Sequence, residues 1–397
     1  MLHEKRRLQP PPFLDDKTKE ACIPVKVLID TYFNAYNAAR LREACQVLSK
    51  AIEEDAVIGV SLAGALTPAG LGPLLVGMMQ LGFIDYISST GANLYHDLHF
   101  DLGLPLYRGP AEAASGCYDT KLREEGVVRI YDVLFENKTL FKTDEFVQRT
   151  LMGSDFFSPD PMGTSKLHHL LGKASHKASH EARSGVNGVL STAYQLDIPV
   201  FCPSPGDSTI GMNLSAIYTA TPGDAPRIDS AIDVMEMASI VLAAKRSGRP
   251  SAVLIFGGGA PKNFMLQTEP QIQEILGIDE KGHDYFVQVT DARPDTGGLS
   301  GATPSEAVSW GKIDPEKLPG CVVCYLDSTV AMPLIASYLM ATCAPRQTGG
   351  LYRQLPALVG RLREEYKATK QFQKFFGSET DRSKSSPPGT SSPDTKG

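Results

Sequence analysis

Six short apolar runs, each followed by small or polar residues, recur along the chain. They cover Ala56–Leu62, Phe83–Ser89, Ile198–Cys202, Ala252–Phe256, Tyr285–Thr290 and Cys321–Leu326. Runs of this kind are typical of strands that are buried on both faces of a sheet. Longer stretches with helical spacing lie between them, including Ala69–Leu81, Ile228–Arg246 and Met332–Thr342. Because helices alternate with strands, we expect an α/β fold: a doubly wound, mainly parallel, Rossmann-like sheet with helices on both faces.

The two ends of the chain differ in composition from its middle. Residues 1–20 are polar and interrupted by prolines, and residues 378–397 are rich in Ser, Pro, Thr, Asp and Lys. The latter segment buries too little apolar surface to offset its chain entropy, so we expect a disordered tail. Residues 21–377 are expected to form one large domain, in which the more polar stretch Phe141–Ser191 makes a helical excursion over the sheet.

Composition narrows the possible classes of protein. The net charge of −6 argues against a general nucleic-acid binder, which needs a basic face. The charged N-terminus lacks the apolar core of a signal peptide, and no run reaches the roughly 18 apolar residues of a membrane span. Seven cysteines, an odd number, do not suggest a disulfide framework. We therefore expect a cytoplasmic protein that binds neither membrane nor nucleic acid.

Two kinds of strand-end residue suit a nucleotide. Phe256-Gly-Gly-Gly-Ala-Pro-Lys262 follows an apolar run, and glycines there let backbone N–H groups approach a phosphate. The run is neither a G-x-G-x-x-G nor a Walker sequence, and a tight turn explains it equally well. Asp207 and Asp327 also end predicted strands, where a carboxylate either accepts ribose hydroxyls or caps a turn.

The candidate for covalent chemistry is Lys312, which stands two residues after Trp310, the only tryptophan. Desolvation beside a large aromatic lowers the pKa of a lysine, and the neutral amine attacks imines and carbonyls. The alternative is a buried Trp310 as an apolar anchor, with Lys312 as a surface charge at a turn.

Histidines and cysteines at suggestive spacings are not interpreted as metal sites. His96 and His99 lack a convincing third ligand, as do His176 and His180, which share a helix face with lysines. Cys321 and Cys324 lie in an apolar strand whose alternation points them to opposite faces. No second C-x-x-C completes a zinc site, so we expect core packing there and no bound metal.

The segment around Lys312 resembles the signature of the deoxyhypusine synthase family: Gly301-Ala-Thr-Pro-Ser-Glu-Ala-Val-Ser-Trp-Gly-Lys-Ile313. The stretch Ser251–Lys262 resembles the family's strand with three glycines, Ile84–Gly91 its cofactor turn, and Tyr325–Leu334 its closing strand and helix. The resemblance extends from about Val57 to Tyr338.

This resemblance implies roles for individual residues. Lys312 would be the catalytic nucleophile that carries an aminobutyl group as an imine. Trp310 would line a polyamine tunnel, and Glu306 would attract the polyamine cation. The remaining substrate-side positions would be His96, Asn263 and Ser300, and NAD would be held by Thr90, Gly91, Asp207, Asp327 and Ser328.

The departures from the family fall on the polyamine side. Tyr95 and His96 stand where the family has paired glutamates, and Met212 replaces an aspartate. Thr296 also replaces an aspartate, next to Asp295, and Asn263 replaces a histidine. Each charged hydrogen bond that is lost weakens binding of a tri-cation by about 1.5–3 kcal/mol. His96 is in addition a candidate proton shuttle, because the unperturbed pKa of histidine lies near neutrality.

These observations predict an NAD-dependent alkylamine transferase of polyamine metabolism, similar to homospermidine synthases, with a small diamine as acceptor. By the family's example we expect a homotetramer. Two alternatives remain open. One is a deoxyhypusine synthase that modifies a protein lysine, and the other is a non-catalytic NAD-binding protein of the same fold.

Overall fold

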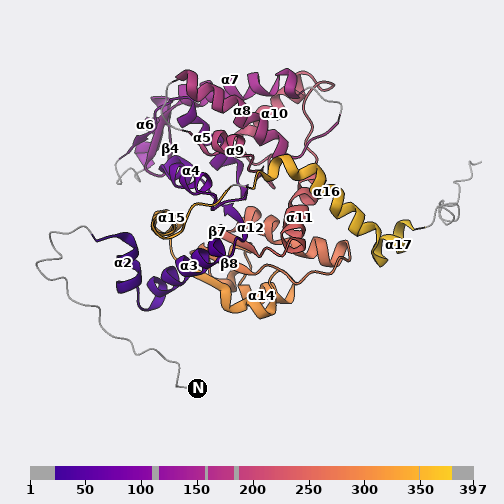
Figure 1. Cartoon of the computed structure of the whole chain (residues 1–397). Coiled ribbons are helices and arrows are strands. Elements are labelled where there is room, and N and C mark those ends of the chain that lie inside the picture. The colour runs from indigo at the N-terminus through magenta and orange to yellow at the C-terminus, as the bar shows by residue number, and fades with distance from the viewer. Residues whose placement is uncertain (1–22, 110–115, 157–159, 183–186, 348, 378–397) are drawn as a thin grey trace, which may run out of the picture.

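The computed structural model describes residues 23–109, 116–156, 160–182, 187–347 and 349–377 (Figure 1). The arm expected at 1–20 and the tail expected at 378–397 lie outside the described residues. None of the described helices is long and apolar enough to cross a membrane.

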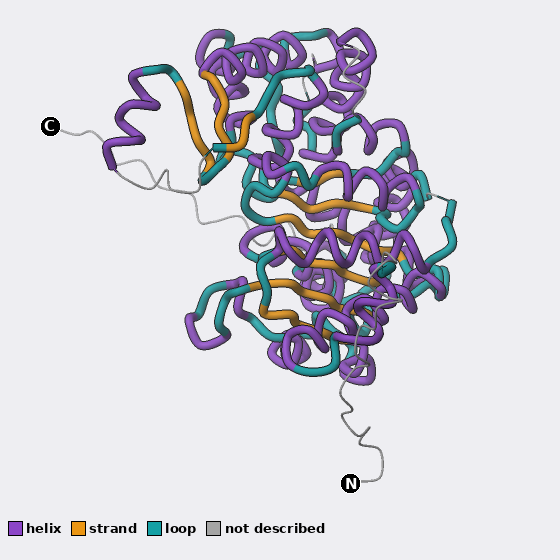
Figure 2. The backbone as a smooth tube through the Cα atoms, turned by 90° about the vertical axis from the view of Figure 1, so that its left-hand side faces the viewer, coloured by secondary structure: helices purple, strands orange, loops and turns teal. Residues whose placement is uncertain are grey.

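A six-stranded sheet forms the centre, in the order β6-β2-β1-β7-β8-β9 (Figure 2). Every neighbouring pair in it is parallel. All six predicted strands are present and differ from the predictions only at their ends. Their bounds are β1 (Val57–Leu62), β2 (Tyr86–Ser89), β6 (Val200–Phe201), β7 (Ser251–Phe256), β8 (Tyr285–Thr290) and β9 (Cys321–Tyr325).

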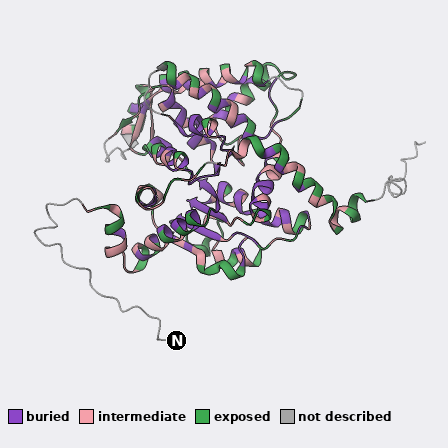
Figure 3. Cartoon of the chain, viewed as in Figure 1, coloured by how far each residue is buried: buried purple, intermediate pink, exposed green. Residues whose placement is uncertain are grey.

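Helices cover both faces of this sheet, each over its own apolar core, which confirms the doubly wound fold. Alternation along the strands sends Leu254 to one core and Val253 to the other. One core lies under α2 (Val25–Tyr32), α3 (Tyr36–Glu53), α4 (Gly72–Gln80), α5 (Gly91–Asp101), α7 (Asn137–Leu151), α8 (Thr164–Ala182), α9 (Val189–Gln195), α10 (Thr209–Ala220) and α15 (Ser328–Thr342). The other lies under α11 (Ser230–Arg246), α12 (Gly259–Leu266), α14 (Pro304–Ser309) and α16 (Leu351–Lys367), and Figure 3 shows the buried sheet between the two layers.

Two cysteines illustrate the two faces. Cys324 is fully buried in the core under α3 and α15, whereas Cys321 packs against the core under α11. The alternation expected of this C-x-x-C is confirmed.

The excursion predicted over Phe141–Ser191 is helical and consists mainly of α7, α8 and the start of α9. A small antiparallel sheet in the order β3-β5-β4 was not predicted, and it stands apart from the main sheet in Figure 2. Its strands are β3 (Tyr107–Arg108), β4 (Val127–Ile130) and β5 (Val133–Glu136), beside α6 (Gly116–Glu124). The last described helix is α17 (Lys370–Phe376), which extends from the body after α16 (Figure 1).

Candidate functional site

The carboxyl ends of four parallel strands enclose a cavity of about 190 Å³, which we call the strand-end cavity. The strand order reverses here, since β2 lies on one side of β1 and β7 on the other. Ligands of open α/β sheets bind at such a switch point. The lining comes from the turns after β1, β2, β6 and β7: Ala63, Gly64, Ser89, Thr90, Gly91, Pro203, Ser204, Asp207, Gly258, Gly259, Ala260 and Pro261.

Three predicted cofactor residues meet in the strand-end cavity. Thr90 is the N-cap of α5 and donates its hydroxyl to the Gly64 carbonyl at 2.6 Å. Gly91 is the first residue of α5, and a Cβ there would collide with the Ser208 side chain. The exposed Asp207 lies across the cavity on the turn after β6.

The donors and acceptors of this cavity fit a dinucleotide. The N-terminus of α5 opens into it, and Gly258 and Gly259 bring the N-terminus of α12 to the same place. Helix N-termini and bare backbone N–H groups suit phosphates, and a carboxylate such as Asp207 suits ribose hydroxyls. NAD is thus compatible with these residues.

A second cavity, of about 240 Å³, contains Lys312; we call it the lysine cavity. Helix α12 joins the two cavities. Its first turn lines the strand-end cavity, whereas Lys262 and Asn263 on its next turn line the lysine cavity. The other lining residues are Leu266, Gln267, Phe286, Leu299, Ala302, Glu306, Ala307 and Trp310.

Lys312 is half-buried, and this burial lowers the pKa of its amine, while the Glu306 carboxylate raises it. Its Nζ donates to Asn263 Oδ1 at 3.4 Å and lies 5.7 Å from the centre of the Trp310 ring. Trp310 is 60% exposed, so it does not act as a buried anchor. The alternative of an anchoring tryptophan and a surface lysine is wrong on both residues.

The lysine cavity also holds Lys262, the last residue of the glycine-containing run after β7. Its side chain is buried, and Nζ donates to Gln288 Oε1 at 2.9 Å and to the Ala302 carbonyl at 2.8 Å. Burial and the neighbouring Lys312 lower the pKa of Lys262 to about 8. Its position after the three glycines was the signal in the sequence, but burial beside a second lysine is visible only in the fold.

Ser300 connects the two cavities without lining either. Its hydroxyl accepts a hydrogen bond from the Gly259 N–H at 3.0 Å, and its neighbour Leu299 lines the lysine cavity. A Cβ at Gly258 would collide with the Ser300 backbone. The loop that carries Ser300 therefore fixes the start of α12.

Asp327 and Ser328 line neither cavity. Asp327 is exposed and caps α15, because its Oδ1 accepts from the Thr329 N–H at 2.7 Å and from the Thr329 hydroxyl. Ser328 is the first residue of that helix. Within one chain the structure does not bring them to the other predicted cofactor residues.

His96 also lies apart from Lys312. Its Nδ1 is 3.1 Å from Nε2 of His99, and its ring packs against Tyr95 and Phe135. Burial lowers the pKa of His96 to about 4, so the ring is neutral at pH 7. The expectation of a proton shuttle with a near-neutral pKa is therefore wrong, because it neglected desolvation.

Of the other positions that depart from the family, Asn263 lines the lysine cavity, whereas Tyr95, Met212 and Asp295 beside Thr296 do not. Tyr95 is buried, and its hydroxyl donates to Asp144 Oδ1 at 2.7 Å. Asp295 is paired with Arg293, and Met212 is exposed on α10. Among the described residues, no group of three or more His, Cys, Asp or Glu side chains is arranged to hold a metal ion.

The family model of deoxyhypusine synthase matches residues 28–339. The chain belongs to the deoxyhypusine synthase family. A deoxyhypusine synthase-like protein from Nostoc punctiforme is 49% identical over 367 residues, which are 92% of this chain and 90% of that protein. A protein from Archaeoglobus fulgidus named probable deoxyhypusine synthase 1 is 34% identical over 324 residues, 81% of this chain and 95% of its own.

Among solved structures, a proposed deoxyhypusine synthase from Entamoeba histolytica has a TM-score of 0.51 and 13% identity. It covers 82% of this chain and 96% of its own, and at this identity the likeness shows the fold alone. Deoxyhypusine synthases are transferases of aminobutyl groups and depend on NAD.

Proposed function

We propose that this member of the deoxyhypusine synthase family is an NAD-dependent alkylamine transferase that carries an aminobutyl group on Lys312 as an imine. The single observation that supports this most directly is the lysine cavity. Its nucleophile has a lowered pKa, and α12 lines both this cavity and the strand-end cavity, whose residues suit a dinucleotide.

Three residues of the lysine cavity have different roles in this reaction. Neutral Lys312 adds to the imine carbon of the oxidised amine. The carbon–nitrogen bond to the diamine then breaks, the diamine leaves with a proton from Nζ, and the carbon becomes an imine of Lys312. The exposed Trp310 ring contributes one wall for the methylenes and cationic end of the substrate. Glu306 supplies a carboxylate for an ammonium group.

The strand-end cavity would hold the cofactor through Thr90, Gly91, Asp207 and the glycines before α12. NAD, when bound, would take up the hydride released by oxidation of the secondary amine and return it to the product. The chain's own part is to hold the amine in the lysine cavity, next to the helix whose first turn lines the strand-end cavity.

We propose further that the acceptor is a small diamine, as in homospermidine synthesis. Among the described residues that line the lysine cavity, Glu306 is the one carboxylate. Tyr95 and His96, which stand where the family has glutamates, are engaged with Asp144 and His99. A site with few carboxylates suits an amine that carries fewer charges than the tri-cation that the family binds. The names of the relatives, on the other hand, favour deoxyhypusine synthase itself as the second candidate.

Product analysis distinguishes these functions. The purified protein is incubated with NAD and spermidine, with and without putrescine, beside a Lys312→Ala variant, and the polyamines are separated. Homospermidine and diaminopropane that form only with Lys312 intact are the expected result. Diaminopropane without homospermidine would favour a protein acceptor, and no cleavage of spermidine would contradict the proposed donor.

A further inference from the structure

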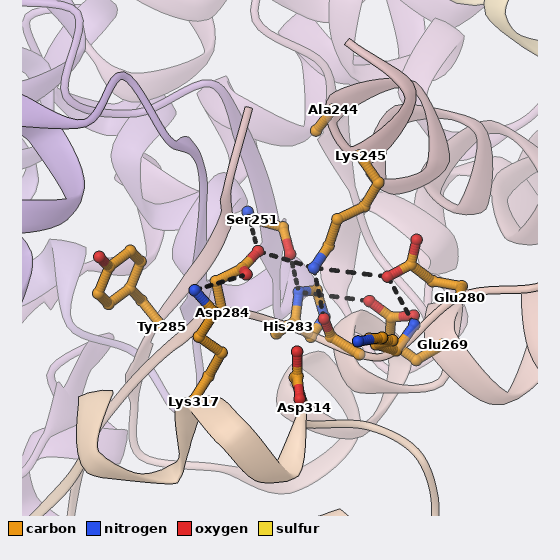
Figure 4. Close-up of polar contacts among 12 residues, drawn as sticks. Ala244, Lys245, Ser251, Glu269, Glu280, His283, Asp284, Tyr285, Asp314 and Lys317 are labelled. Carbon is orange, nitrogen blue, oxygen red and sulfur yellow. Dashed lines mark hydrogen bonds and ion pairs between the residues drawn. The ribbon is translucent and has the colours of Figure 1, made fainter. Parts of the chain in front are cut away.

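A largely buried polar network connects Lys245 with Asp284 and Glu280, and it also contains His283 and Glu269 (Figure 4). Lys245 pairs with Asp284 at 2.7 Å and with Glu280 at 3.5 Å, at the amino ends of β7 and β8. His283 and Glu269 are fully buried beside them, with Glu269 Oε1 at 3.8 Å from His283 Nδ1. These residues belong to neither cavity, and the chemistry proposed above does not use them.

The network reaches the nucleophile through the backbone. The amide of Gln273 donates from Nε2 to the Gly311 carbonyl at 2.7 Å and to Glu269 Oε2 at 3.3 Å. On the other side of the lysine, the His283 N–H donates to the Lys312 carbonyl at 3.0 Å. Both peptide carbonyls that flank the Lys312 Cα therefore accept a hydrogen bond, one from Gln273 and the other from His283.

The segment needs this support because its backbone is unusual. Gly311 has φ of 67°, and a Cβ there would lie 2.5 Å from Gln273 Oε1. Only glycine adopts this conformation at no steric cost, but glycine is also free to leave it. Gln273 lies on η3 (Gln271–Ile275), a single π-helical turn, and such turns occur frequently at functional sites.

Glu269 is suited to hold the amide of Gln273. Burial raises the pKa of Glu269 to about 8, so the carboxyl is neutral at pH 7. Its Oε1 has no hydrogen-bond partner among the described residues, which leaves Oε2 and Gln273 as its defined contact. Without Gln273 neither oxygen of this buried carboxyl would have a hydrogen-bond partner among the described residues, so the geometry of the pair is strongly preferred.

We propose that Gln273 is a positioning residue for Lys312. Held by Glu269, it fixes the Gly311 carbonyl and so directs the lysine Nζ into the lysine cavity. The proposal rests on Lys312 being the nucleophile of the proposed function. Because a displacement of about 1 Å costs on the order of 100-fold in rate, loosening this carbonyl should slow the reaction without weakening substrate binding.

The test compares two glutamines of the same turn. Gln273→Met keeps the length of the side chain and removes the donor to Gly311. The matched control is Gln271→Met, because Gln271 is equally half-buried and its amide contacts Met235 Sδ instead. Glu269→Gln keeps the acceptor for Gln273 and should behave like the unaltered protein.

Two readouts are measured for each variant. The first is the pH profile of Lys312 acylation by an amine-selective reagent, located by peptide mass spectrometry, which needs no turnover. The second is kcat and KM for the donor amine with NAD present. Gln273→Met should lower Lys312 labelling at pH 7.5 at least about fivefold and kcat about 10- to 100-fold, with KM within about threefold. Gln271→Met should stay within about twofold on both.

The outcomes separate the two proposals. Equal labelling and equal kcat for Gln273→Met and Gln271→Met would overturn the positioning role. If the unaltered protein has no turnover yet Gln273→Met alone lowers labelling, the proposed function fails and the positioning role stands. If Gln273→Met does not fold, Gln273→Ser replaces it in both measurements with the same expectations.

Discussion

Lys262 and Lys312 share one cavity but differ in how they are held. Lys262 donates to two fixed acceptors, Gln288 and the Ala302 carbonyl, and is buried. Lys312 has a 3.4 Å contact with Asn263 and is only half-buried. An amine with two fixed hydrogen bonds is suited to influence the pKa of its neighbour. An amine with few contacts is suited to attack the substrate and to carry the aminobutyl group. This difference supports Lys312 as the nucleophile.

The lowered pKa of Lys262 should make the free energy of unfolding depend on pH. Its pKa in the folded protein is about 8, below the ordinary value of 10.5, so the unfolded chain binds more protons between these values. Folding stability should therefore rise with pH from about 8 towards 10.5, by at most about 3 kcal/mol. The unfolding free energy of the unaltered protein minus that of Lys262→Met, measured by urea at several pH values, should increase with pH. A difference independent of pH would contradict the assignment.

Glu306 should affect reactivity and binding in opposite directions. Its carboxylate raises the pKa of Lys312, so Glu306→Gln should lower that pKa and increase Lys312 labelling at pH 7.5 by about two- to threefold, as for an exposed pair. The same change should raise KM for the donor amine, since an ammonium group loses its partner. Labelling that falls would show that the carboxylate does not act on Lys312.

At the scale of elements, α12 connects the two cavities. Its start is determined by three glycines after β7, and its next turn presents Lys262 and Asn263. Ser300 holds the Gly259 N–H from a separate loop. Any shift of this helix start should therefore affect cofactor and amine together.

Gly258→Ala tests this coupling. The added Cβ would meet the Ser300 backbone, so the loop has to move, at a cost of about 1–3 kcal/mol. NAD affinity and the rate of Lys312 labelling should both fall at least about tenfold, by calorimetry and mass spectrometry. Gly206→Ala is the control, because a Cβ there meets nothing within 4 Å. Loss of NAD binding with unchanged labelling would separate the two cavities.

Some of the strands were predictable from the sequence and others were not. The strands of the main sheet were predictable because both of their faces are buried, which makes them continuous apolar runs. The β4–β5 hairpin was missed, since Tyr131 takes φ of 53° at its turn where glycine or asparagine is the usual signal. Thr90, Gly91 and Asp207 were assigned to the cofactor by the family resemblance, and the structure brings them together because they follow strands of one sheet.

The rest of the candidate site depends on contacts between distant segments. The contacts of buried Lys262 and the contact of Gln273 with Gly311 join residues 26 or more positions apart, and no local pattern marks them. His96 was identifiable as a residue type, but its burial beside His99 and Phe135, which lowers its pKa, was not predictable.

For the whole molecule, the position of Asp327 bears on assembly. In one chain it caps α15 away from both cavities. If Asp327 contacts NAD as the family resemblance implies, we propose that it does so in the site of a second copy, within the homotetramer expected above. The active site would then be incomplete in a monomer.

Mixing two inactive variants tests this arrangement. Co-expressed Lys312→Ala and Asp327→Ala chains that pair at random should regain about a quarter of the activity, because half of the pairs contain one intact site out of two. Light scattering should report a tetramer for each variant alone. No recovery in mixed tetramers would place Asp327 and Lys312 in the same chain's site, or Asp327 outside it.

The proposed role of Lys312 is tested most directly by trapping the aminobutyl imine on its Nζ. The protein is incubated with NAD and spermidine, reduced with borohydride, digested and mapped by mass spectrometry. We expect an aminobutyl adduct on Lys312 that is absent from Lys312→Ala. No adduct, or an adduct on Lys262 instead, would contradict it.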